Sequence, residues 1–192
     1  GAVARATERL SQGEIFEFQI GLQADTSEAS YFTMVGDKTA SLISAACRIG
    51  PLMADAPREM IEALTKYGEY LGLAFQIADD MLDFTSDVST LGKPVGHDLR
   101  ERKITLPLIK ALDAAPAAER AEVVGILASA EPTEADWTRV CDFVAQHDGV
   151  AAAQDTAHAY AAKAQACLEI LPPSVSRSIL ETAVRLVVVR DN

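Results

Sequence analysis

Apolar residues recur at spacings of three and four along almost the whole chain, and no segment shows the strict alternation typical of a half-buried strand. This period predicts amphipathic helices, and Gly50-Pro51 is expected to end one of them. It indicates an all-α bundle, and a length of 192 residues suits a single domain, residues 1–192. We expect helices over these ranges: Ala2–Leu22, Ser27–Ile49, Pro57–Phe84, Thr105–Ala114, Ala117–Ala130, Thr133–Gln146, Val150–Leu171 and Ser174–Val189.

Charge and hydropathy exclude several classes of partner. The formal net charge is −11, with 17 Lys and Arg against 28 Asp and Glu, so no nucleic-acid partner is expected, because phosphate backbones are bound by clustered cations. No apolar run approaches the roughly 20 residues that a membrane span requires, so we predict no span and a cytoplasmic location. Cys47, Cys141 and Cys167 stand far apart without CxxC spacing, which favours buried thiols in a reducing compartment.

The stretch FQIADDMLDFTSD, which begins at Phe75, places three aspartates on one apolar helix. At about 100° per residue, its polar side chains fall within about a third of the helix circumference: Gln76, Asp79, Asp80 and Asp83. Like charges one turn apart destabilise each other, and a hard divalent cation such as Mg²⁺ relieves that repulsion. On the triplet alone, the alternative is a set of acidic residues at a solvated, frayed helix end.

A lysine stands inside the apolar stripe of SEASYFTMVGDKTASLISAACRIG. Lys38 lies four residues after Met34 and four before Leu42. A lysine there must extend to solvent, pair with an acid, or face a cavity. With Thr39 beside it, Lys38 could place an ammonium and a hydroxyl in a cavity shared with Gln76 and the aspartates. Cations beside metal-binding carboxylates would suit a highly charged phosphate group.

The loop LGKPVGHDLRERK adds further charges shortly after the aspartates. Gly92 and Gly96 permit tight backbone geometry around Lys93, and Asp98 and Lys103 follow before the next expected helix. Taken alone, a lysine between glycines also fits an ordinary solvated loop.

Together these segments resemble those of the trans-type polyprenyl diphosphate synthases. FQIADDMLD is similar to the second aspartate-rich motif of that family, GKPVGHDLRERKITLP to the segment after it, GDKTASL to its Lys-Thr motif and GEIFEF to its Gly-Glu helix. The order and spacing of these segments are similar over nearly the whole chain. The overall character of the sequence most resembles that of bacterial long-chain, octaprenyl-like synthases. It implies an isoprenoid-synthase-type helical bundle that forms a homodimer.

The resemblance implies a prenyltransferase that elongates an allylic diphosphate by head-to-tail condensation with isopentenyl diphosphate and releases pyrophosphate. It implies that Asp79, Asp80 and Asp83 bind Mg²⁺, directly or through water, and that Asp98 supports the metal shell. The need for a metal follows from the reaction, because ionising an allylic C–O bond requires stabilisation of the departing pyrophosphate.

The same resemblance assigns the remaining polar residues. Lys38 and Lys93 would grip the allylic diphosphate, with Lys103 as a helper. Thr39 and Gln76 would turn oxygen dipoles toward the developing allylic carbocation. An acidic protein can bind diphosphates in this way, because metal ions and local lysines reverse the field at the site.

One family feature is absent. Family members carry a first aspartate-rich motif on an opposing helix, whereas Asp79-Asp80 is the only Asp-Asp pair in this chain. We expect the missing motif before Gly1, so that the chain is the C-terminal part of a bundle incomplete at its N-terminus and is inactive alone. Two alternatives stay open: a noncatalytic partner subunit of a heteromeric prenyl synthase, and a class I terpene cyclase relative, whose second metal motif is normally an Asn/Ser/Glu pattern.

Overall fold

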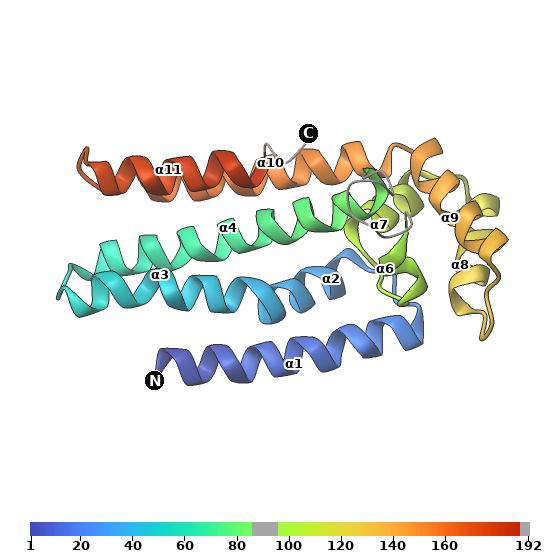
Figure 1. Ribbon diagram of the computed structural model, residues 1–192, viewed down its shortest axis with the longest axis horizontal. Coiled ribbons are helices and arrows are strands. Elements are labelled where there is room, and N and C mark those ends of the chain that lie inside the picture. Colours follow the sequence, from blue (N-terminus) through green and yellow to red (C-terminus); the bar gives the residue numbers. More distant parts are fainter. Residues whose placement is uncertain (86–95, 189–192) are drawn as a thin grey trace. The chain divides into compact units, whose positions relative to one another are not determined.

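The computed structural model describes residues 1–85 and 96–188, and within these ranges every regular element is helical (Figure 1). The all-α prediction is therefore confirmed for the described residues. The elements are α1 (Ala2–Gln23), α2 (Glu28–Val35), η1 (Gly36–Ala40), α3 (Ser41–Met53), α4 (Arg58–Thr85), α6 (His97–Arg100), α7 (Leu106–Ala114), α8 (Ala117–Ala128), α9 (Glu134–Gln146), α10 (Gly149–Cys167) and α11 (Val175–Val188).

The chain divides into two compact units. The first comprises Gly1–Glu14, Phe32–Ala78 and Thr156–Asn192, and the second comprises Ile15–Tyr31 and Asp79–Asp155. Helices α1, α2, α4 and α10 contribute residues to both units. The prediction of one domain over residues 1–192 stays a prediction.

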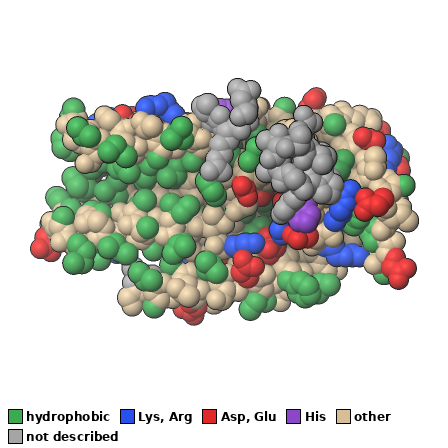
Figure 2. Space-filling view, in the orientation of Figure 1, with side chains coloured by type: hydrophobic (Ala, Val, Ile, Leu, Met, Phe, Trp, Pro, Cys, Tyr) green, Lys and Arg blue, Asp and Glu red, His purple; other side chains and the backbone are tan. Residues whose placement is uncertain are grey.

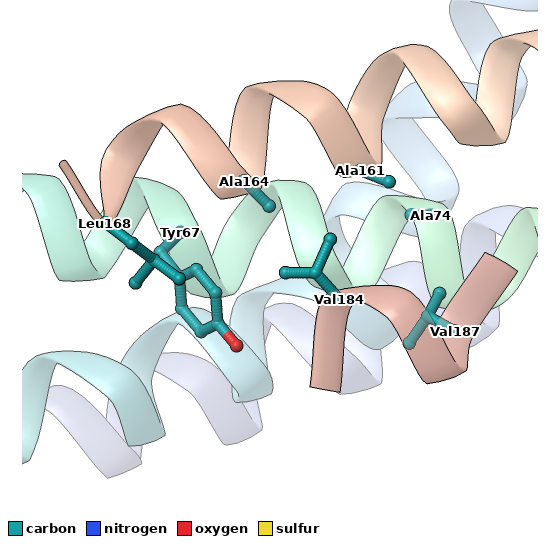
Figure 3. Packing of buried hydrophobic residues seen from close by; sticks show 7 residues of the cluster. All are labelled: Tyr67, Ala74, Ala161, Ala164, Leu168, Val184 and Val187. Carbon is teal, nitrogen blue, oxygen red and sulfur yellow. The ribbon is translucent and has the colours of Figure 1, made fainter. Parts of the chain in front are cut away.

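The core of the first unit is a seam of small and branched side chains between α4, α10 and α11 (Figure 3). The buried alanines Ala157, Ala161 and Ala164 lie at spacings of four and three on α10 and let the neighbouring helices approach closely. The hydroxyl of Tyr67 donates to the carbonyl oxygen of Leu180 at 3.0 Å, and burial raises the pKa of Tyr67 to about 12. The buried residues are Tyr67, Ala74, Ala161, Ala164, Leu168, Val184 and Val187.

Hydrophobic side chains also stay exposed on the first unit. Helix α3 exposes Leu52 and Met53, and α11 exposes Val175, Ile179 and Leu186. Figure 2 shows hydrophobic side chains gathered over α3, α4 and α11 on the face in view. Apolar surface of this extent is typical of a face that is covered by another part of an assembly.

A π-helical turn, η1, separates α2 from α3, where the sequence predicts one uninterrupted helix. A π turn holds an extra residue, so every later side chain is rotated relative to the regular period. Ala40 and Ser41 are buried, whereas Leu42 is 46% exposed. The prediction that Leu42 continues the apolar stripe was wrong, because it carried a constant period through this turn.

The expected stop at Gly50-Pro51 was also wrong, because α3 continues to Met53 with Pro51 inside it. Pro51 lacks the N–H that would donate to the carbonyl oxygen four residues earlier, so α3 continues for two further residues without that bond. The N–H groups of Ala54 and Ala56 donate to the carbonyl oxygens of Gly50 and Pro51 at 3.2 and 3.0 Å and close the helix end.

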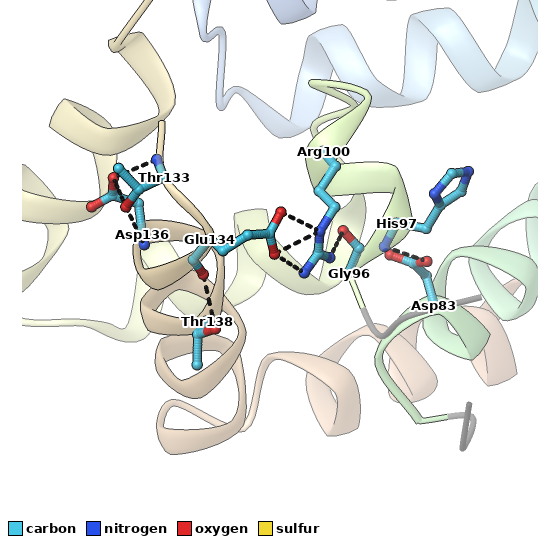
Figure 4. A network of polar contacts seen from close by, with 8 residues as sticks. All are labelled: Asp83, Gly96, His97, Arg100, Thr133, Glu134, Asp136 and Thr138. Carbon is cyan, nitrogen blue, oxygen red and sulfur yellow. Dashed lines mark hydrogen bonds and ion pairs between the residues drawn. The ribbon is translucent and has the colours of Figure 1, made fainter. Parts of the chain in front are cut away.

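The second unit has its core between α7, α8 and α9, where α7 contacts α9. Helix α9 begins with a capping box: the Asp136 N–H donates to Thr133 Oγ1 at 3.2 Å, and the Thr133 N–H donates to Asp136 Oδ2 at 2.8 Å (Figure 4). Among the described residues, none of the helices combines the length and apolarity needed to cross a bilayer. The buried core residues include Leu106, Leu108, Ile109, Leu112, Val123, Leu127, Trp137, Val140, Phe143 and Val144.

Candidate functional site

The predicted site residues fall into two groups, one in each unit. In the first unit, Lys38 and Thr39 lie in η1 and Gln76 lies in α4. Thr39 Oγ1 donates to Gln76 Oε1 at 2.8 Å, so the structure brings these two residues together. Lys38 Nζ lies 3.4 Å from Glu14 Oε1, and 23% of the lysine side chain is exposed. Of the three fates open to this lysine, the structure shows pairing with an acid.

Helix α1 lies directly against η1. A Cβ atom added to Gly13 would lie 2.5 Å from the backbone nitrogen of Lys38 and 2.8 Å from its Cα. One turn earlier, Arg9 Nε donates to Asp37 Oδ1 at 2.6 Å and Arg9 Nη2 donates to the Gly36 carbonyl oxygen at 3.2 Å. Sequence reasoning missed Arg9 and Asp37, and the glycine of GEIFEF was the available signal for this close approach.

In the second unit, the aspartates of α4 have contrasting surroundings. Asp79 is exposed to solvent, whereas Asp80 is only 5% exposed. The hydroxyl of Tyr31, itself buried, donates to Asp80 Oδ2 at 2.6 Å. A buried carboxylate needs such a partner, because desolvation is costly without one. Sequence reasoning placed Tyr31 in an apolar stripe and missed the role of its hydroxyl.

Asp83 holds the N-terminal end of α6. Its Oδ1 accepts the N–H of His97 at 3.0 Å (Figure 4), and its Oδ2 accepts the N–H of Asp98 at 3.1 Å. Burial, followed by the negative charge of Asp98, raises the pKa of Asp83, and the two N–H bonds oppose that rise.

Lys103 is paired within the same unit. Its Nζ lies 2.8 Å from Glu101 Oε2 and 3.1 Å from Asp98 Oδ1. Burial lowers the pKa of Lys103, but the hydrogen bonds to Glu101 and Asp98 outweigh burial and raise the pKa above its ordinary value. Lys103 and Asp98 thus form a direct ion pair that orients both side chains.

Arg100 ties α6 to α9 (Figure 4). Its Nη2 donates to Glu134 Oε2 at 2.8 Å, and its Nη1 donates to the Gly96 carbonyl oxygen at 2.8 Å. Gly96 has a φ of 73°, and a Cβ there would lie 2.7 Å from Cys141 Sγ, so this position requires glycine. The segment that follows Gly96 is therefore held by α9 as well as by Asp83.

Metal binding is compatible with the chemistry of these donors. Asp79 and Asp83 lie one turn apart on the same face of α4, and their carboxylate oxygens are the donors that hard divalent cations prefer. Across residues 1–85 and 96–188, no three His, Cys, Asp or Glu side chains gather as a metal-holding group. The assignment of Asp79, Asp80 and Asp83 as metal ligands, with Asp98 behind them, stays a prediction. Lys93 lies outside the described residues.

The first unit also contains a cavity of about 560 Å³ between α1 and α3. Arg5, Arg9, Arg48, Ser41 and Leu52 are among its lining residues. The predicted residues of η1 and α4 are not among them, so this cavity is distinct from the Thr39–Gln76 contact.

Comparison with known proteins gives a consistent result. The family model described as polyprenyl synthetase matches residues 1–144. A short chain isoprenyl diphosphate synthase of Methanothermobacter thermautotrophicus is 34% identical over 184 residues, which cover 96% of this chain and 56% of the relative. An octaprenyl diphosphate synthase of Haemophilus influenzae is 34% identical over 189 residues, 98% of this chain and 57% of the relative. The chain therefore spans about half the length of these curated relatives.

A solved structure extends this likeness to the fold. The polyprenyl synthase from Caulobacter crescentus, crystallised with calcium and isoprenyl diphosphate, matches with a TM-score of 0.90 and 36% identity. The match covers 100% of this chain and 58% of that one. It confirms the expected isoprenoid-synthase type of helical bundle. The equal identity of a short-chain and an octaprenyl relative means that identity alone does not select a product length.

Proposed function

Because this chain belongs to the polyprenyl synthetase family, we propose that it forms part of a prenyltransferase that elongates an allylic diphosphate with isopentenyl diphosphate. In this head-to-tail condensation, the allylic C–O bond breaks, the double bond of isopentenyl diphosphate attacks, and pyrophosphate and a proton are released. The observation that carries the proposal is the family match over residues 1–144, because that range includes both η1 and α4.

The Thr39–Gln76 contact supports a role beside the allylic cation. Because the Thr39 hydroxyl donates a hydrogen bond to Gln76 Oε1 at 2.8 Å, the lone pairs of the hydroxyl oxygen can face a positive charge. The contact also fixes both side chains, so their dipoles need little reorganisation when the charge develops. In the proposed enzyme, Lys38 binds the allylic diphosphate, with Lys93 and Lys103 as further cations.

We propose Mg²⁺ as the metal, held by Asp79, Asp80 and Asp83 and supported by Asp98. When bound, the ion stabilises the negative charge of the departing pyrophosphate. The chain's own contribution is to orient these carboxylates: Tyr31 fixes Asp80 through a 2.6 Å hydrogen bond, and two N–H groups of α6 fix Asp83. Calcium in the Caulobacter crescentus structure supports the use of a divalent cation.

We also propose a homodimer, as the resemblance implies. Helix α1 buries Ile20 and Gly21 and yet exposes Ile15, Phe18 and Leu22 at i, i+3 and i+7. A helix that is apolar on an exposed face as well as a buried one is typical of a subunit contact. The cytoplasmic location and the absence of a nucleic-acid partner stay predictions.

The test is incorporation of radiolabelled isopentenyl diphosphate by the full-length protein, with allylic primers of different lengths and Mg²⁺. We expect linear, chain-extended products and released pyrophosphate. Cyclised products, or activity only after a second protein is added, would contradict the proposal in favour of a cyclase or a heteromeric subunit. We further expect that the 192-residue chain alone incorporates no label, since it carries a single Asp-Asp pair.

A further inference from the structure

The π-helical turn η1 requires support from outside itself. Widened turns of this kind are rare and occur mostly as short interruptions of α-helices, frequently at functional sites. Within η1, the Ser41 N–H donates to the Gly36 carbonyl oxygen, and the Ser41 hydroxyl donates to the Asp37 carbonyl oxygen at 2.7 Å. These bonds close the turn, but they do not determine where it lies relative to α1.

Helix α1 supplies that constraint through one side chain. The Arg9 guanidinium contacts two consecutive residues of η1: Nε reaches Asp37 Oδ1 at 2.6 Å, and Nη2 reaches the Gly36 carbonyl oxygen at 3.2 Å. Charge-assisted bonds from a planar guanidinium are stronger and more directional than neutral ones. Arg9 therefore acts as a two-point clamp on the first half of the turn.

Gly13 permits the close approach of α1 to η1. It lies one turn after Arg9 on α1, and the absence of a side chain permits its Cα to lie against the backbone of Lys38. The carboxylate of the next residue, Glu14, lies 3.4 Å from Lys38 Nζ. The second half of η1 is thus fixed by contact with α1, and the first half by Arg9.

We infer that Arg9 and Asp37 are positioning residues, which hold η1 so that Lys38 and Thr39 present their side chains correctly to the diphosphate and the allylic carbon. This inference rests on the proposed function for the roles of Lys38 and Thr39. Arg9 itself contacts the turn and not the groups assigned to the substrate. If η1 were displaced, it would lose the hydrogen bond from Thr39 to Gln76 of α4.

The test compares Arg9→Met with a matched control, Arg58→Met. Arg58 also forms a 2.6 Å Nε–Oε1 ion pair, with Glu62 in the same unit, but that pair joins residues of a single helix. Amide hydrogen exchange over residues 36–41 and titration with inorganic pyrophosphate and Mg²⁺ are both measured on the full-length protein. Neither readout requires prenyl transfer, so failure of the proposed reaction is seen separately in the incorporation assay.

We expect Arg9→Met to speed exchange in residues 36–41 and to weaken pyrophosphate binding by about two- to fivefold, the effect of losing an ion pair that is partly exposed to solvent. Arg58→Met should change neither. Arg9→Lys should restore part of the binding, because it keeps the charge without the two-point contact, and Asp37→Asn should act in the same direction as Arg9→Met. Unchanged exchange in Arg9→Met, faster exchange without weaker binding, or an equal effect of Arg58→Met would each overturn the inference.

Discussion

Replacing Gly13 with alanine tests the contact between α1 and η1 most directly. The added methyl carbon would lie 2.5 Å from the Lys38 backbone nitrogen and 2.8 Å from its Cα and Cβ. None of these atoms can rotate away as the tip of a flexible side chain can, so either α1 or η1 must shift. Introducing atoms into such a packed contact destabilises by about 1–3 kcal/mol.

The opposing term is helix propensity, and a second glycine measures it. Glycine to alanine in a helix interior stabilises by up to about 1 kcal/mol. Gly125 lies within α8, is exposed, and would have no heavy atom within 4 Å of an added Cβ. Gly125→Ala should therefore stabilise the fold. Gly13→Ala combines the same gain with the steric cost, so the two variants should differ by about 1–3 kcal/mol in the free energy of unfolding.

The assay is urea denaturation of the 192-residue chain, followed by far-ultraviolet circular dichroism, with the midpoint and slope fitted for both variants. Equal stabilisation by Gly13→Ala and Gly125→Ala would refute the reasoning, since it would mean that α1 does not lie against Lys38 in solution. A changed slope in Gly13→Ala alone would instead indicate a change in the surface exposed on unfolding.

Three further substitutions probe the site. Asp79→Ala in the full-length protein should abolish most isopentenyl incorporation while leaving helical content unchanged, because Asp79 is exposed; wild-type turnover would contradict the metal assignment. Lys38→Ala should weaken pyrophosphate binding while changing the melting temperature little. A large fall in melting temperature with unchanged binding would indicate that Lys38 has only a structural role. Tyr31→Phe should destabilise by about 1–3 kcal/mol, because it removes the 2.6 Å hydrogen bond to the buried Asp80 carboxyl group. The loss should exceed that of Tyr67→Phe, which removes a bond to a backbone carbonyl, and equal losses in urea denaturation would contradict this ranking.

The fold class could be read from the sequence because apolar period and capping chemistry are local properties. Thr133 and Asp136 lie three residues apart, and their capping box depends on nothing else in the molecule. The end of α3 could not be read in the same way. Gly50-Pro51 is a strong local stop signal, but a proline removes only its own N–H donor, and α3 continues past it to Met53.

The candidate site was predictable only in part. Lys38 was identified as a charge within an apolar stripe, with Thr39 beside it, and Gln76 as a neighbour of the aspartates on α4. The Thr39–Gln76 bond brings two of these three residues together. The role of Tyr31 could not be predicted, because a tyrosine in an apolar stripe indicates a buried ring but does not identify the hydrogen-bond partner of its hydroxyl. Arg9 could not be identified either, since its partner Asp37 lies 28 positions away and the pairing depends on how α1 meets η1.

One physical feature, the π turn η1, explains both the exposure of Leu42 and the position of Lys38. In a helix of constant period, Lys38 and Leu42 would share one stripe, and an ammonium group would be forced into an apolar contact. The extra residue of η1 rotates the two apart: Leu42 becomes exposed, and Lys38 reaches Glu14 at the edge of α1. Single π turns inside α-helices occur frequently at functional sites, so the position of η1 at Lys38 and Thr39 is consistent with the role proposed for these residues. On this reasoning, the place where the helical period breaks is a structural feature that distinguishes Lys38, the lysine proposed to bind the diphosphate.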